Sequence, residues 1–165
     1  MLGNLYQSAG AFKLNEAQEL FIDFKKILLA TDGSKSAINA TKHAIGWAKV
    51  FKAKVRAIFV DINCESANQT PKTIDQYLDS GNINKNGYNG LLVARQYAQN
   101  NDVPCEELVI TGNVARSIID NAEKFLPELI VIGNSEKSGI RRSLGSIADA
   151  VMKGTDIPVL VVSDT

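Results

Sequence analysis

The sequence predicts one α/β domain with an open, mostly parallel sheet of five strands and helices on both faces. Short runs rich in β-branched residues alternate along the chain with stretches whose apolar residues recur at helical spacing. The run 129–132 is apolar throughout, as expected of a parallel strand that is covered on both faces. At 165 residues the chain is long enough for one sizeable core and too short for two ordinary domains.

The first half of the domain predicts a βαβ unit. A strand at 25–31 is followed by a loop at 32–36, a helix that ends at about Phe51 and a second strand at 55–60. Because a helix connects the two strands, they should be parallel neighbours with a right-handed crossover. The inner face of the helix carries small residues suited to close packing on a sheet, and we interpret Trp47 as a core residue of that face.

The middle of the chain has weaker patterns. Residues 71–80 predict a turn or two of helix after Pro71, a residue that suits a first helical turn. Glycine and asparagine then break the pattern up to residue 87, and a further helix is expected at about 91–100. The irregular stretch 62–87 could act as a flap beside a site.

The second half continues the alternation of strands and helices. Ile118 and Phe125 are expected to face inward from one of its helices, and Gly154 ends the other. The expected elements are a strand at 104–110, a helix at 114–125, a strand at 129–132, a helix that starts near 146 and a strand at 157–162.

Residues 1–24 are predicted to be an N-terminal extension of a domain at 25–165. Leu14, Ala17, Leu20 and Phe21 recur at helical spacing and predict a short helix at about 14–22. Such a helix could dock on the domain or on a partner.

Composition narrows the class of function. The formal net charge is zero, which gives no electrostatic footprint for nucleic-acid binding. No apolar run is long enough for a membrane span and no secretory signal is evident, so we expect a cytoplasmic protein without a membrane partner. Cys64 and Cys105 lack metal-ligand spacing and are expected to be inert thiols, and His43 lacks triad-like partners.

The stretch after the strand at 129–132 predicts an anion site. Gly133, Gly139 and Gly145 alternate with serine hydroxyls before a helix begins. Free backbone N–H groups of such a loop and helix start attract phosphate, helped by the helix dipole. A plain strand-to-helix turn capped by serine is the alternative, because a glycine-rich loop alone is a weak motif.

Ligands of parallel sheets bind outside the carboxyl ends of the strands. Those ends carry Asp32, Asp61, Gly112 and Gly133. Asp32 could instead cap its own turn, and Asp61 could be a strand-end cap.

The stretches 27–34 and 59–61, the turn 111–113 and the segment 129–162 resemble the universal stress protein family in their residues and their order. The resemblance covers about residues 25–163 and implies a Rossmann-like fold of the adenine nucleotide alpha hydrolase-like type.

Many members of that family bind ATP through a signature of Gly, two residues, Gly, nine residues, Gly, then Ser or Thr. Gly133, Gly145 and Ser146 match its first glycine, last glycine and hydroxyl. Glu136 stands at the second glycine position, and the interval from Gly133 to Gly145 is one residue short.

The resemblance implies a site for an adenine nucleotide. It assigns Asp32 to the ribose and the backbone near Val60 to the adenine edge. Its ligand would be ATP or AMP, with Mg²⁺ possible beside ATP. The implied binding residues are Ala30, Thr31, Asp32, Val60, Gly112, Ile132, Gly133, Asn134, Ser135, Glu136, Gly145, Ser146 and Ile147.

The leading hypothesis is a small stress-response protein that binds ATP or AMP as a signal without efficient turnover, since no general base is evident. Slow hydrolysis or autophosphorylation stays open. The alternative is an interaction protein of the same fold that no longer binds ATP, because of Glu136 and the short loop. In either case the apolar strand at 157–162, at a sheet edge, predicts a homodimer.

Overall fold

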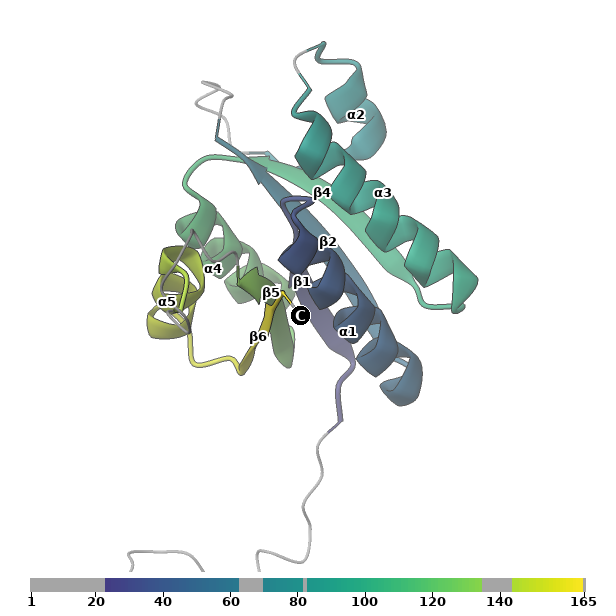
Figure 1. Cartoon of the computed structure of the whole chain (residues 1–165), viewed down its shortest axis with the longest axis vertical. Helices are drawn as coiled ribbons and strands as arrows, with labels where there is room; N and C mark the ends of the chain where they lie inside the picture. The colour runs from purple at the N-terminus through teal and green to yellow at the C-terminus, as the bar shows by residue number, and fades with distance from the viewer. Residues whose placement is uncertain (1–22, 63–69, 82, 135–143, 165) are drawn as a thin grey trace, which may run out of the picture.

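The structure, a computed structural model, describes residues 23–62, 70–81, 83–134 and 144–164. In these residues one sheet has the strand order β3-β4-β2-β1-β5-β6 (Figure 1). The strands are β1 (Lys26–Ala30), β2 (Lys54–Asp61), β3 (Lys72–Thr73), β4 (Cys105–Thr111), β5 (Leu129–Asn134) and β6 (Val159–Ser163). The helices are α1 (Lys35–Phe51), α2 (Ile74–Leu78), α3 (Lys85–Asn100), α4 (Val114–Phe125) and α5 (Ser146–Lys153).

The predicted α/β fold with a mostly parallel open sheet is confirmed, but the described sheet has six strands and not five. The additional strand is β3, which runs antiparallel to β4 with Lys72 opposite Val109. A two-residue strand carries no periodicity of its own. Its pairing with β4 defines it, so the sequence pattern alone could not reveal it.

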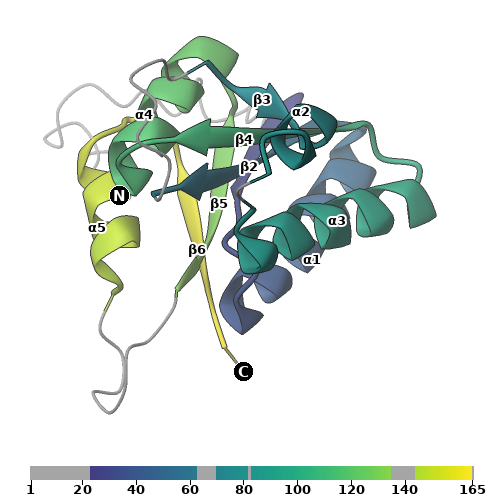
Figure 2. The same cartoon turned by 90° about the horizontal axis from the view of Figure 1, so that it is seen from above.

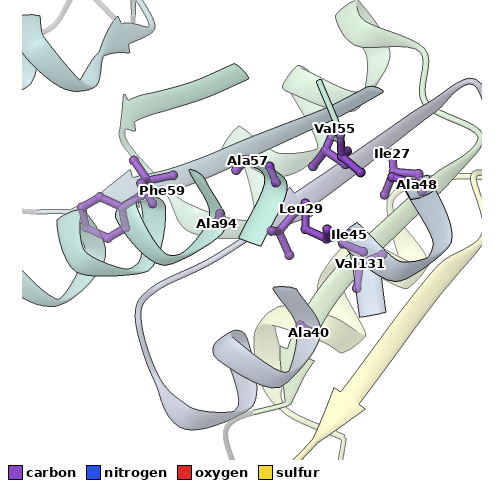
Figure 3. Packing of buried hydrophobic residues seen from close by; sticks show 14 of the residues in the cluster. Ile27, Leu29, Ala40, Ile45, Ala48, Val55, Ala57, Phe59, Ala94 and Val131 are labelled. Atoms are coloured by element: carbon purple, nitrogen blue, oxygen red, sulfur yellow. The ribbon is translucent and has the colours of Figure 1, made fainter. Parts of the chain in front are cut away.

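Helices cover both faces of the sheet, with α1 and α3 on one side and α4 and α5 on the other (Figure 2). Ile27 and Leu29 point to the first side, where they pack with Phe59 and the small residues of α1 (Figure 3). Leu28 points to the second side and packs with Ile58. All three β1 side chains are fully buried, which explains why this strand is apolar without alternation.

Two helices have the predicted ends, α1 at Phe51 and α4 at both of its termini. The prediction for α3 was wrong, because it begins at Lys85 and not near 91. Gly87, which the sequence pattern assigns to a break, is a packing residue, because a Cβ atom there would overlap the ring of Phe59. Gly90 also packs closely, since a Cβ atom on it would lie 2.7 Å from the backbone nitrogen of Gly33. Glycine usually indicates the end of a helix, but in α3 it allows the helix to pack closely against its neighbours.

The stretch 62–87 is more regular than predicted in the part that the structure describes. It contains β3, α2 and the start of α3, and Thr73 and Gln76 cap α2 reciprocally. Residues 63–69 and 82 lie outside the described residues, as does the helix predicted at 14–22.

The interpretation of Trp47 as a core residue was wrong. Its side chain is 43% exposed on the outer side of α1, whereas Ala40, Ala44 and Ala48 form the buried face. The small residues bring α1 close to the sheet, so an indole has no room on that side.

Candidate functional site

A cavity of about 150 Å³ opens at the carboxyl ends of β1, β2 and β5, under the first turns of α4 and α5. Its lining is mostly apolar, with the polar side chains of Thr31 and Asp32 on the β1 side. An apolar cavity with a few polar groups at its edge suits a flat organic ligand. The lining residues are Ala30, Thr31, Asp32, Ala37, Ile58, Phe59, Val60, Val114, Ile118, Ile132, Gly133 and Ile147.

The loop after β1 is held by short-range hydrogen bonds. The Thr31 backbone N–H donates to the Ile58 carbonyl at 2.9 Å, and its hydroxyl accepts from the Gly33 N–H at 3.3 Å. Gly33 has a φ of 76°, and a Cβ atom there would overlap the Asn86 carbonyl of α3. The loop therefore needs glycine for its backbone conformation and for its contact with α3.

Asp32 is exposed, and its Oδ1 atom accepts a hydrogen bond of 2.9 Å from the Ser34 N–H. The turn-cap alternative thus describes a real contact. It does not exclude ligand binding, because a carboxylate has about four acceptor positions and this contact uses one. Asp32 can cap the turn and offer its other oxygen to a hydroxyl of a ligand in the cavity.

Gly133 has a structural reason to be glycine that is independent of any ligand. A Cβ atom at this position would lie 2.5 Å from the Ala37 nitrogen and 2.6 Å from the Ser36 carbonyl carbon. The start of α1 therefore rests directly on the backbone of β5. This contact brings the β1 loop and the end of β5 to the same side of the cavity.

The two ends of the predicted anion loop are tied together. The buried side chain of Asn134 accepts a hydrogen bond of 2.7 Å from the Gly145 N–H. Ser135 and Glu136, between them, lie outside the described residues. Asn134 thus connects the end of β5 to the residue that precedes α5.

The start of α5 differs from the other helix starts in the described part of the chain. Side chains of Ser34, Thr73, Asn84 and Asn113 cap α1, α2, α3 and α4, whereas Gly145 gives α5 no side-chain cap. Among the described residues no side chain caps the first backbone N–H groups of α5, where the helix dipole favours an anion.

The structure brings together seven of the thirteen predicted site residues as cavity lining. Gly112, Asn134, Gly145 and Ser146 are described but do not line the cavity. Gly112 directly follows β4, has a φ of 139° and donates its N–H to the Asp61 carbonyl at 3.3 Å. The seven are Ala30, Thr31, Asp32, Val60, Ile132, Gly133 and Ile147.

Sequence reasoning missed five lining residues: Ala37, Ile58, Phe59, Val114 and Ile118. A signal existed for part of this set. Ile58 precedes Val60 by two residues and so shares its face of β2. Val114 and Ile118 are one helical turn apart at the start of α4, but this spacing does not place them at the cavity.

Asp61 does more than cap a strand end. Its carboxylate accepts a hydrogen bond of 2.6 Å from the Tyr77 hydroxyl, which accepts in turn from the Asn84 N–H at 2.7 Å. Asp61 and Tyr77 are 3% and 2% exposed. The contact ties the end of β2, next to the cavity, to α2 and to the cap of α3.

Other chemistry is limited in the residues described. They contain no group of three or more potential metal ligands, and none of their helices is long and apolar enough to cross a bilayer. Burial raises the pKa of the Cys105 thiol to about 12, and Cys105 is unpaired. Cys64 lies outside the described residues.

Comparison with known proteins identifies the family. The model of the universal stress protein family matches residues 23–163. The chain belongs to this family. A curated relative, universal stress protein MJ0531 of Methanocaldococcus jannaschii, is 36% identical over 140 residues, which are 84% of this chain and 82% of the relative.

Solved structures of universal stress proteins share the fold. One, described as a complex with cAMP, has a TM-score of 0.66 at 22% identity and covers 87% of this chain and 100% of its own. Another, from Arabidopsis thaliana with AMP bound, has a TM-score of 0.56 at 18% identity and covers 86% and 92%.

Proposed function

We propose that this universal stress protein binds an adenine nucleotide, ATP or AMP, in the cavity at the carboxyl edge of the sheet. The nucleotide acts as a signal in a cytoplasmic stress response and is not turned over efficiently. One observation carries the proposal: seven of the residues that family resemblance assigns to the nucleotide, from β1 and its loop, β2, β5 and α5, line a single cavity.

Each part of a nucleotide has a complementary surface. The adenine ring fits the apolar lining beside Ile58 and Val60, where backbone groups at the end of β2 can read its edge. Asp32 accepts the ribose hydroxyls at the mouth of the cavity. The uncapped start of α5, next to Ile147 of the lining, takes the phosphates.

Relatives support an adenine ligand. One structural neighbour was solved with cAMP and another with AMP. The two ligands share adenine and ribose and differ in their phosphates. The proposed contacts to adenine and ribose are therefore the ones that would select adenine nucleotides as the ligand class of this chain.

The lining offers little for phosphoryl transfer. Asp32 is its one carboxylate, and this group is already placed against the Ser34 N–H and the proposed ribose. Phosphoryl transfer requires a positioned base or water and a held metal ion. Mg²⁺ can accompany ATP through the phosphates without making the protein an efficient ATPase.

A direct test is mass analysis of freshly purified protein after denaturation. Co-purified AMP or ATP in near-stoichiometric amount supports the proposal. A protein that is free of nucleotide and that does not take up ATP, AMP or adenosine in equilibrium dialysis contradicts it.

The second candidate is a family member that acts through protein contacts and no longer binds ATP. The observation in its favour is that Asn134 already occupies the Gly145 N–H, at the last glycine of the ATP signature. If the shortened loop has abolished the phosphate site, Asn134→Ala and Glu136→Gly should not create ATP affinity in a protein that lacks it. If either substitution tightens ATP but leaves adenosine unchanged, the phosphate site is intact and only attenuated.

We also propose a homodimer through β6. This strand lies at the edge of the sheet, and Val159, Leu160 and Val161 are only half-buried. A groove of about 350 Å³ runs between β6 and the α1 residues Asn39, Lys42 and His43. A second copy would pair the free edge and cover these apolar side chains. Sedimentation at micromolar concentration should give a dimer mass, and a monomer with and without ATP would refute this.

A further inference from the structure

Four apolar residues lie together where the last turns of α1 meet the residues before β1, far from the cavity; Trp47 and Val50 are exposed, and Phe24 and Phe51 are half-buried. Trp47 is 43% exposed and Val50 is 71% exposed. The ring of Phe51 stacks on Trp47 at 6.0 Å between centroids, and Phe24 meets Phe51 edge-on at 4.8 Å. We call Phe24, Trp47, Val50 and Phe51 the aromatic patch. Contiguous exposed apolar groups of this kind mark interaction surfaces.

The aromatic patch has a glycine, Gly46, beside it, and no packing contact with the other described residues requires glycine at this position. A Cβ atom on Gly46 would meet nothing within 4 Å, although glycine destabilises a helix interior relative to alanine. Gly46 precedes Trp47 on the outer side of α1, and the described residues leave the helix surface uncovered at this point.

The chain itself leads to this patch. Phe24 is part of the patch and is the second described residue, so residues 1–22 join the domain beside this surface. The start of β1 and the end of α1 lie at the same end of the molecule in Figure 1. Residues directly before Phe24 are therefore at high local concentration beside Trp47.

Charges on the two partners are complementary. Helix α1 carries Lys35, Lys42 and Lys49 and no acidic residue. Residues 14–22 carry Glu16 and Glu19 and no cation, whereas Asp23 after them already pairs with Lys25 at 2.7 Å. Opposite charge favours this pairing and gives it a dependence on ionic strength.

We propose that residues 14–22 form an amphipathic segment that packs on the aromatic patch. Ala17, Leu20 and Phe21 recur at helical spacing in register with Phe24 and supply its apolar side. They cover Trp47 and Val50, while the carboxylates of the segment approach the lysines of α1. The N-terminal extension is thus an intramolecular cover of α1.

Trp47 reports on this contact directly, because it is the one tryptophan of the chain. The experiment compares the full-length protein with Phe21→Asp and with the control Asn15→Asp. Asn15 lies on the opposite side of the segment, so the control adds the same charge without touching the proposed contact. Emission maximum and iodide quenching of Trp47 are measured at low protein concentration, and circular dichroism verifies the fold.

Phe21→Asp should shift the emission to the red by several nanometres and raise the quenching constant severalfold, while Asn15→Asp behaves as wild type. Leu20→Ser, which adds no charge, should act in the same direction as Phe21→Asp. High salt should increase quenching of the wild type by uncharged acrylamide. Identical emission in all four proteins overturns the proposal. A wild-type emission that shifts with protein concentration also overturns it, because a second copy of the chain then covers the patch.

Discussion

The Tyr77 hydroxyl donates a hydrogen bond of 2.6 Å to the Asp61 carboxylate, and both side chains are buried. Because the hydroxyl also accepts from the Asn84 N–H, one oxygen connects β2 to the start of α3. Tyr77→Phe removes both bonds without changing the ring. We expect a loss of about 1.5–3 kcal/mol in the free energy of unfolding, since a buried carboxylate loses a donor.

Urea denaturation measures this loss. Tyr97→Phe is the matched control, because the half-buried Tyr97 has no side-chain hydrogen bond with the other described residues. A loss for Tyr77→Phe no larger than that of the control would mean that the contact between Asp61 and Tyr77 contributes nothing to stability.

The contact of Gly133 with α1 predicts a stability effect that is separate from ligand binding. Gly133→Ala should destabilise the nucleotide-free protein by about 1–3 kcal/mol, because the new methyl group overlaps the backbone at Ala37. Gly46→Ala is the contrasting variant and should stabilise by about 0.5–1 kcal/mol, since its methyl group enters open space on a helix. Thermal melts without ligand compare them. Equal midpoints would contradict the packing explanation.

Two substitutions of Asp32 separate its cap from its proposed ribose contact. Asp32→Asn keeps an oxygen for the Ser34 N–H and loses the charge, whereas Asp32→Ala loses both. We expect Asp32→Ala to weaken adenosine, AMP and ATP by similar factors of about ten to a hundred, the equivalent of a lost charged hydrogen bond. Asp32→Asn should weaken all three at unchanged stability.

Calorimetric titration of the three ligands measures these factors. If both variants bind the three ligands like the wild type and Asp32→Ala merely lowers the stability of the fold, Asp32 is a turn cap and not a ligand contact.

Cys105 should be unreactive in the folded protein. Burial raises the pKa of its thiol to about 12 from an ordinary value of 9.0. At pH 8 its thiolate is then roughly a thousandfold scarcer than in the unfolded chain, and thiolate is the reactive form. The neutral thiol stabilises the fold below pH 9, and this contribution is lost as the pH rises toward 12.

Iodoacetamide labelling of the Cys64→Ser variant, which leaves Cys105 as the one thiol, tests this at pH 8 with and without urea. Rapid labelling of the native protein would show that Cys105 is accessible and ionised.

The sequence was sufficient for the parallel strands because the central residues of β1, β2 and β5 are buried on both faces and apolar without alternation. The sequence pattern was misleading where tertiary packing, and not local preference, decided where a residue lies. Gly87 and Gly90 belong to a helix that approaches Phe59 and Gly33, and Trp47 lies outside because the inner side of α1 accepts only small residues.

The same distinction applies to the site. Asp32 and Gly133 could be proposed from motifs, since motifs record chain positions next to strand ends. Val114 and Ile118 could not be assigned to the site, because only the fold brings α4 over the end of β2. The hydrogen bond between Asp61 and Tyr77 joins residues 16 positions apart, and no local sequence pattern predicts it.

The most direct test of the central claim is calorimetric titration of refolded, nucleotide-free protein with AMP and with ATP. The account predicts saturable binding at one site per chain, lost when Ala30→Leu fills the cavity in a folded protein. Absence of binding by both nucleotides to the folded wild type, or binding that Ala30→Leu leaves unchanged, would contradict it.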